Sequence, residues 1–280
     1  MVLPKKLFGP FGYDGHKKTF FFASYEGLRQ RAAANLITTV PTEALRRGDF
    51  SQLRNSAGQP IAIYDPLDTT GAGASLVRRP FPGNIIPQSR FDPVAANVQR
   101  YWPLPNRSGD VNTGFNNFVT SGATPFDIDQ WDVKLDQNLS ERQRLAVRVS
   151  RRHLVSGFPT FFPTEIRIAE DGRAFPETAH NVGLDYTRTV SPTYLVNFRY
   201  GFARNLWAQS TRSDGFDPTQ LGFPAYFRNN ADVLLFPAFA PAGYYRLGTG
   251  YSLGIGRTGL DVHTWQLGNT KVLSRHLLKF

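Results

Sequence analysis

Two short glycine-rich motifs near the C-terminal end of the sequence could carry chemistry. Residues 250–254, GYSLG, have the GxSxG spacing of a hydrolase nucleophile turn, in which Ser252 would attack the substrate. Residues 254–259, GIGRTG, have the GxGxxG spacing of a dinucleotide-binding turn. Both motifs require a helix directly after them, whereas residues 255–259 are poor helix formers and residues 260–267 have the pattern of a strand. We therefore interpret this stretch as part of an extracellular loop, and we expect no enzymatic activity.

An acidic cluster is the other candidate for a chemical site. It comprises Asp127, Asp129, Asp132 and Asp136. A calcium loop would need regularly spaced ligands and a turn glycine, which this segment lacks. We expect these carboxylates to pair across strands with Arg144 and Arg148.

The sequence offers few residues for a metal site or a thiol nucleophile. The chain has no cysteine, which excludes disulfides, cysteine-ligated zinc and a thiol nucleophile. Its five histidines are scattered, and no two have the i, i+4 spacing of a helical metal site. The sequence therefore predicts no catalytic, metal-binding or cofactor-binding residues, and the residues that contact a ligand are unknown.

Composition and charge limit the class of protein. The 280 residues are 41% hydrophobic and 14% aromatic, which argues against wholesale disorder. The net charge of +10 could suit nucleic acid, but the arginines lie in separate groups without a recognisable nucleic-acid module, so we expect no nucleic-acid partner. No apolar run is long enough for a transmembrane helix, and residues 1–10 lack the apolar region of a signal peptide.

Alternating apolar and polar residues identify the elements that must position these side chains. The period of two that marks a strand with two different faces recurs along the chain. It is found at residues 129–136, 144–151, 181–187 and 194–202, with further candidates at 18–30, 261–271 and 276–280.

The connections between these strands fall into two length classes. Short turns lie at 138–142, 190–193 and 273–276, whereas long segments fill 41–126, 154–178 and 206–260. Short turns at one end and long loops at the other are typical of a transmembrane β-barrel. Trp131, Tyr186, Tyr194 and Tyr200 are then candidates for aromatic girdles, although core aromatics of a soluble sandwich remain an alternative.

The long segment 41–126 is rich in proline and carries aromatic anchors. Phe81, Phe91, Tyr101 and Trp102 could pack against one another, and residues 92–100 predict a short helix with Asp92 as its N-cap. The segment is either a lid that contacts a ligand or an ordered loop folded over the barrel rim.

Several strings, in the same order along the chain, resemble one family. They are FGPFGYDGHKKTFFFASYEGLRQ at 8–30, TVPTEALRRGDFS at 39–51, IYDP at 63–66, PFPGNIIPQSRFDPVA at 80–95, YWPLPN at 101–106 and DQWDVKLDQNLSERQRLAVRVS at 129–150. These strings resemble Oar-like, OmpA-related TonB-dependent receptors of acidobacteria and their relatives. The resemblance covers most of the chain, and residues 208–260 match only in character. It implies an outer-membrane transporter with a plug inside a large barrel, energised through an inner-membrane TonB complex.

The resemblance and the patterns together predict an all-β protein with part of an antiparallel transmembrane β-barrel, about seven or eight strands with long extracellular loops. Because no TonB box or plug is recognisable, we expect a fragment of the parent barrel. Residues 1–16 would be a remnant of the connection from plug to barrel, and residues 17–280 the N-terminal part of the barrel. The expected divisions are a strand region at 17–40, a long extracellular loop at 41–127, a hairpin at 128–152, a hairpin at 179–205, a long loop at 206–260 and a hairpin at 261–280.

Three functional hypotheses follow. The first is energy-coupled uptake or binding of an unidentified ligand by the intact parent, in the outer membrane of a Gram-negative-type bacterium. Its partners would be outer-membrane lipid and lipopolysaccharide, the TonB complex and an unknown extracellular ligand. The second is a surface adhesion or binding module without transport, and the third and weakest is a secreted hydrolase that uses Ser252.

Overall fold

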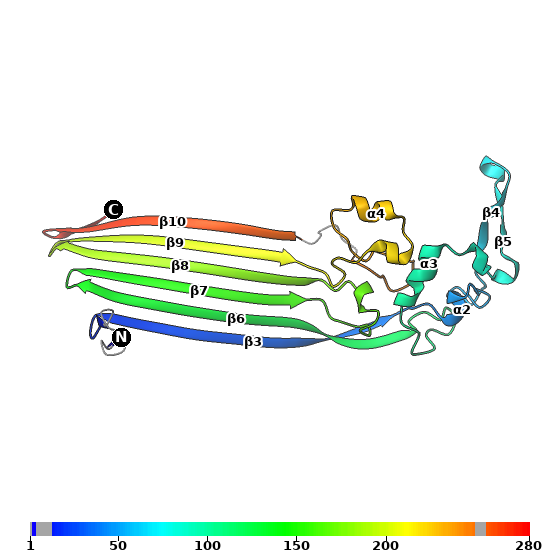
Figure 1. Cartoon of the computed structure of the whole chain (residues 1–280), viewed down its shortest axis with the longest axis horizontal. Helices are drawn as coiled ribbons and strands as arrows, with labels where there is room; N and C mark the ends of the chain where they lie inside the picture. The colour runs from blue at the N-terminus through cyan, green and yellow to red at the C-terminus, as the bar shows by residue number, and fades with distance from the viewer. Residues whose placement is uncertain (1, 4–12, 250–255) are drawn as a thin grey trace.

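One large antiparallel sheet dominates the chain. The computed structural model describes residues 2–3, 13–249 and 256–280. Seven strands lie side by side along the long axis of the molecule, in the order β11-β10-β9-β8-β7-β6-β3 (Figure 1). Their bounds are β3 Thr19–Thr38, β6 Phe118–Ser140, β7 Gln143–Gly157, β8 Ala174–Ser191, β9 Tyr194–Gln209, β10 Gly256–Leu273 and β11 His276–Lys279. The expected all-β, antiparallel fold is confirmed.

Strands of the large sheet that follow one another along the chain lie side by side in it. Within the described residues from β6 onward, each strand pairs with the next along the chain, and β3 pairs with β6 across the first long loop. The β6–β7, β8–β9 and β10–β11 turns all lie at one end of the sheet (Figure 1). Such tight antiparallel connections fix the register, because a slip of one residue would turn every side chain to the opposite face.

The strands extend further than the alternating segments of the sequence. β6 begins at Phe118, which pairs with Thr38, and β7 continues to Gly157. The added part of β6, TSGATP at 120–125, has no apolar alternation and is therefore invisible to a pattern search. The first long loop is correspondingly shorter than the expected 41–127.

The long loops gather at the other end of the sheet and contain the short elements (Figure 1). These elements are α2 Glu43–Arg46, β4 Tyr64–Thr70, β5 Val77–Pro80, α3 Pro93–Val98 and α4 Ala225–Asn230, with 3₁₀ turns at Gly73–Ser75, Pro82–Asn84, Gln88–Arg90, Gln99–Tyr101, Arg167–Ala169 and Pro218–Leu221. The helix expected from Asp92 onward is α3, and the Asp92 carboxylate caps it by accepting from the backbone N–H groups of Val94 and Ala95. None of the described helices is long and apolar enough to cross a membrane.

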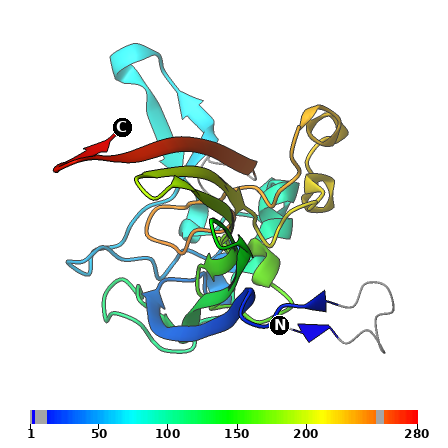
Figure 2. The ribbon, with the colours of Figure 1, turned by 90° about the vertical axis from the view of Figure 1, so that its left-hand side faces the viewer.

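The sheet is curved and is not closed into a ring (Figure 2). β3 lies at one edge, and β10 lies at the other except where its last residues pair with β11. A separate pair, β1 Val2–Leu3 with β2 Tyr13–Asp14, precedes the sheet along the chain.

The loops and the sheet differ in how deeply their apolar side chains are buried. The main cluster of buried apolar side chains comes mostly from the loops: Val40, Val98, Tyr101, Trp102, Phe118, Phe162, Ala169, Phe216, Leu221, Phe236 and Leu247. In contrast, many large apolar side chains of the strands are open to the surroundings, such as Phe21 at 66% and Trp265 at 64% exposure. The loops therefore form a compact body with its own core, which we call the cap, while the sheet leaves an apolar face uncovered.

Candidate functional site

The strand register sorts the side chains of the sheet onto two unlike faces. Val133, Val149, Val182 and Phe202 lie in one row across β6, β7, β8 and β9, because each is the direct partner of the next. We call the face that carries them the apolar face. Its other large members are Phe21, Tyr25, Trp131, Leu135, Leu145, Val147, Leu184, Tyr186, Phe198, Tyr200, Trp265 and Leu267.

The apolar face is bounded by polar side chains at two levels. On β6 the band lies between Gln137 and Asp129, and on β7 between Gln143 and Arg151. Eight residues of strand cover about 26 Å. This length suits a tilted strand that crosses an apolar layer about 25 Å thick.

Aromatic residues line both borders of this band. Near the cap, Tyr25 and Trp131 lie with their ring centres 4.3 Å apart. Tyr200 and Trp265 lie 5.7 Å apart within the band, level with Val147. Near the turns, the Tyr186 hydroxyl donates to Gln143 and the Tyr194 hydroxyl donates to Asn269. All four tyrosine and tryptophan residues proposed as girdle candidates thus lie on the apolar face: Trp131 at the border near the cap, Tyr186 and Tyr194 near the turns, and Tyr200 within the band.

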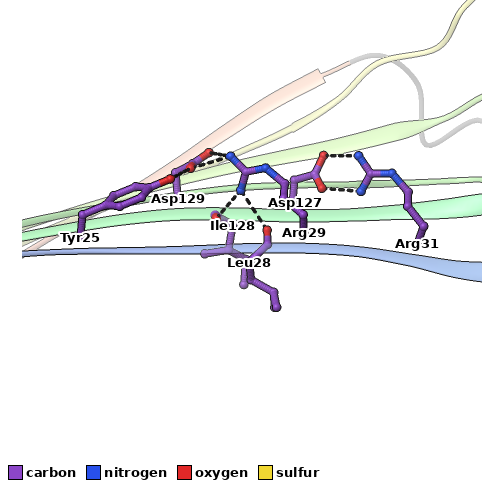
Figure 3. Close-up of polar contacts among 7 residues, drawn as sticks. All are labelled: Tyr25, Leu28, Arg29, Arg31, Asp127, Ile128 and Asp129. Atoms are coloured by element: carbon purple, nitrogen blue, oxygen red, sulfur yellow. Dashed lines mark hydrogen bonds and ion pairs between the residues drawn. The ribbon is translucent and has the colours of Figure 1, made fainter.

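Ion pairs occupy the apolar side of the sheet just beyond the aromatic border (Figure 3). The Arg29 guanidinium holds both carboxylate oxygens of Asp129 at 2.7 and 2.9 Å, and the Tyr25 hydroxyl donates to the same carboxylate at 2.6 Å. The Arg31 guanidinium donates two further hydrogen bonds to the carboxylate of Asp127.

This arrangement corrects one expectation from the sequence. Asp127 and Asp129 do not pair with Arg144 or Arg148. Their side chains lie on the same face of the sheet as Trp131, whereas Asp132 lies on the other face. Their level beyond the apolar band explains how charged groups can occupy that face.

The opposite face of the sheet, which we call the polar face, carries the pairs that the sequence predicts. Arg148 lies 2.8 Å from Asp132, and Arg144 lies 3.1 Å from Asp136. A third pair joins Asp185 of β8 and Arg199 of β9 at 2.7 Å. The guanidinium groups of these pairs are largely exposed, as expected for a wet surface, whereas Asp132 and Asp136 are mostly covered by their partners and neighbours.

A hollow of about 650 Å³ lies on the polar face among these ion pairs. Two glycines that are direct cross-strand partners, Gly183 and Gly201, form part of its floor. A methyl group at Gly183 would meet no atom within 4 Å. The glycine floor and charged walls give this hollow a polar rim.

The cap is held together by polar contacts between distant loop segments. Arg46 of α2 donates to the carbonyl oxygens of Gln99, Trp102 and Pro103. The buried Asn117 side chain both accepts from and donates to the backbone of Val40. Each contact satisfies backbone groups that a loop would otherwise leave unpaired, so the loop 39–117 has a fixed shape.

Glu170 ties the second long loop to the third. It is 2% exposed, and one of its oxygens accepts from the backbone N–H groups of Phe161 and Phe162 at 2.7 and 2.9 Å. Its other oxygen lies 3.4 Å from Arg212. Burial raises the pKa of the Glu170 carboxyl, although these donors act in the opposite direction.

A second hollow of about 500 Å³ opens on the cap. Its polar lining includes Asp49, Arg54, Asp110 and Asn112, and Tyr244 forms part of its wall. Burial raises the pKa of the Tyr244 phenol, which keeps this hydroxyl neutral. The hollow is accessible from outside and is the candidate ligand-contacting surface of the cap.

The catalytic motifs gain no support from the geometry. Ser252 and the whole GYSLG string lie outside the described residues. Of the GIGRTG string, residues 256–259 belong to β10, so a strand stands where a dinucleotide turn needs a helix. Among residues 2–3, 13–249 and 256–280, no group of three histidine, aspartate or glutamate side chains could hold a metal ion.

Two features escape sequence reasoning. Glu170 lies in a loop without a motif, and its role depends on contacts with segments up to 42 residues away. A row of basic side chains on the apolar face, level with the aromatic border at Trp131, is made by cross-strand register and has no signal in any single strand. Counting back from the strand turns could have placed that row.

Comparison with protein families gives a match over nearly the whole chain. A family model described as "Outer membrane beta barrel domain" matches residues 7–280. No curated protein and no solved structure matches the chain.

Proposed function

The chain belongs to the outer membrane beta barrel domain family and resides in the outer membrane, and from this premise we propose that it is part of an Oar-like, TonB-dependent receptor. The intact parent would take up or bind an extracellular ligand, using energy delivered through the TonB complex. Proteins of this family are generally not enzymes. The strings at 8–30, 39–51, 80–95 and 129–150 support the finer assignment, since they resemble such receptors and follow one another in the same order.

The observation that carries the proposal is the contrast between the two faces of the sheet. The apolar face has the height and aromatic borders of a lipid-facing band, while the polar face carries ion pairs around a hollow of about 650 Å³. A wide polar interior suits a large barrel that holds a plug or passes a bulky ligand. Unpaired backbone in lipid is costly, so β3 and β10 would pair with further strands in the intact barrel.

Cross-linking in cells tests the energy coupling. The parent protein would be cross-linked to TonB in living cells, with the proton-motive force intact or collapsed. The proposal expects a TonB adduct that depends on the proton-motive force. Absence of any adduct under both conditions, with a known TonB-dependent receptor cross-linking in the same cells, would overturn it.

The second candidate is an adhesion or binding module, which the folded cap favours. Three loops share one buried core and present a hollow of about 500 Å³ outward. Such a module would hold cells on polysaccharide- or protein-coated surfaces whether or not the proton-motive force is present. Attachment that requires the cap, without a TonB adduct, would favour this candidate.

A further inference from the structure

A row of basic side chains crosses the apolar face at the level of its aromatic border. Arg151 of β7 is the direct partner of His180 of β8, and His180 is the direct partner of Arg204 of β9. His153 lies two residues beyond Arg151 on β7, closer to the cap and on the same face. Directly opposed side chains on one face have Cβ atoms about 5 Å apart, so these groups share a small area.

The acids on this face are already engaged by other groups. Asp261 binds Arg204 through hydrogen bonds of 2.5 and 2.7 Å. Asp129, the partner of His153 in the register, is held by Arg29 and Tyr25. Within the described part of the chain, Arg151 and His180 have no hydrogen bond or ion pair of their own. His153 shares a 2.9 Å hydrogen bond with the Thr178 hydroxyl through Nδ1, which leaves its Nε2 for a ligand.

The position of Arg151, His180 and Arg204 along the strands determines which layer of the membrane they contact. Two residues below Arg151 on the strand is Val149, whose row continues through Val182 and Phe202 and belongs to the lipid-facing band. Two strand residues span about 7 Å, which is the step from the edge of the acyl chains into the head groups. The long loops lie at this end of the sheet, and long loops mark the outer side of an outer-membrane barrel.

An anionic head group complements this row in charge and shape. Arg151 brings a positive charge to the row, and the neighbouring His180 adds a ring N–H donor. The guanidinium of an arginine binds a phosphate through paired hydrogen bonds, and a neighbouring imidazole can donate a further one. An acyl chain attached to that phosphate-bearing lipid could lie along Val149, Val182 and Phe202.

We propose that Arg151, His153 and His180 form a site on the outer wall of the barrel for the phosphate of a lipopolysaccharide-type glycolipid of the outer leaflet. Arg204 borders the site and is anchored by Asp261. The site requires the outer-membrane placement of the sheet and does not depend on energy coupling. Loss of lipid binding with an unchanged TonB adduct would therefore leave the proposed transport function intact.

Lipid retention provides the test. The parent protein would be extracted from outer membranes in mild detergent, and bound lipid A would be quantified by native mass spectrometry after detergent exchange. The double variant Arg151→Gln with His180→Gln should retain at least fivefold less lipid A than the unaltered protein. The matched control is Arg152→Gln, which removes the neighbouring arginine on the polar face, where it lies 3.7 Å from Glu177, and it should retain the normal amount.

Further arms identify the ligand and guard against misfolding. Removal of the phosphates from lipid A should weaken its binding to the unaltered protein as much as the double substitution weakens the binding of intact lipid A. A 10-fold excess of inorganic phosphate should not displace lipid A. Arg151→Lys should retain more lipid A than Arg151→Gln, because it keeps the charge in the same fold. Equal retention by the double variant and Arg152→Gln, equal binding of dephosphorylated lipid A, or displacement by free phosphate would each overturn the proposal.

Discussion

The indole Nε1 of Trp102 donates a 2.7 Å hydrogen bond to the carbonyl oxygen of Tyr245, and this bond joins the first long loop to the third across 143 positions of the chain. Trp102 is 5% exposed, so the bond lies inside the core of the cap. The cap is therefore one folded body, and its loops should open together.

Substitution of Trp102 tests that unity. Trp102→Phe keeps an aromatic ring but leaves the Tyr245 carbonyl without its donor, which should lower the free energy of cap unfolding by about 1–3 kcal/mol. Trp102→Ala also creates a cavity and should cost about 3–5 kcal/mol. In both variants, amide hydrogen exchange should become faster in residues 210–249 as well as in residues 39–117. Val111→Ala, at a fully exposed loop position, should change neither segment, and exchange confined to one loop would contradict a single folded cap.

Glu170 should make the cap sensitive to pH. Burial raises the pKa of this carboxyl in the folded protein, so the folded state retains the proton longer than the unfolded state does. The free energy of cap unfolding should then fall as pH rises from the unfolded pKa, about 4.3, through the raised folded pKa, and level off above it. Glu170→Gln, which preserves the acceptor for both backbone N–H groups, should flatten this dependence. Glu170→Ala should destabilise the cap by about 2 kcal/mol or more at every pH, since it leaves buried donors unsatisfied. An unchanged pH profile in Glu170→Gln would refute the assignment.

Gly248 has both a left-handed backbone and a close neighbour. Its φ is +75°, and a methyl group there would lie 2.3 Å from the Pro237 carbonyl oxygen. Gly215 has a φ of +80° but nothing within 4 Å of its would-be methyl group. Gly215→Ala should cost about 1 kcal/mol from backbone strain alone, and Gly248→Ala should cost clearly more. Protease resistance of the cap under urea would compare them, and equal losses would count against the close packing of Gly248.

Neighbouring residues on β7 provide a test of the two faces. Val147 lies mid-way along the apolar band, and the adjacent Ala146 lies on the polar face beside the hollow. Val147→Arg should destabilise the inserted barrel by about 2–4 kcal/mol, the cost of a basic side chain near the middle of the bilayer. Ala146→Arg should insert normally. The measurement is the fraction of protein that resists urea extraction from outer membranes, and similar losses for both variants would show that the faces are wrongly assigned.

The sequence predicts the sheet far better than the cap. Alternation such as that of Val147 and Arg148 reports local geometry, so the strands and short turns can be expected from single segments, and the Asp132–Arg148 pair from the hairpin that one short turn forms. The contact of Trp102 with Tyr245 joins residues with no shared period, and so no local pattern announces it.

Asp129 shows where alternation itself misleads. It continues the apolar face of Trp131 on the same strand, but it lies beyond the lipid-facing band, where charge is tolerated. Sequence alternation indicates which face a side chain takes. Its depth in the membrane depends on the distance from the turn and on the partners in neighbouring strands, such as Arg29.

Site-directed spin labelling along β7 tests the central claim most directly, because the chain has no native cysteine to remove. Single cysteines at successive positions from Leu145 to Arg151 would be labelled in outer membranes, and collision rates with oxygen and with a water-soluble nickel chelate would be measured. Positions 145, 147 and 149 should favour oxygen, and positions 146, 148 and 150 should favour the chelate, with the change to water at Arg151. Uniform accessibility along the strand, or protection of positions 145, 147 and 149 from both reagents as in a soluble core, would contradict a lipid-facing barrel wall.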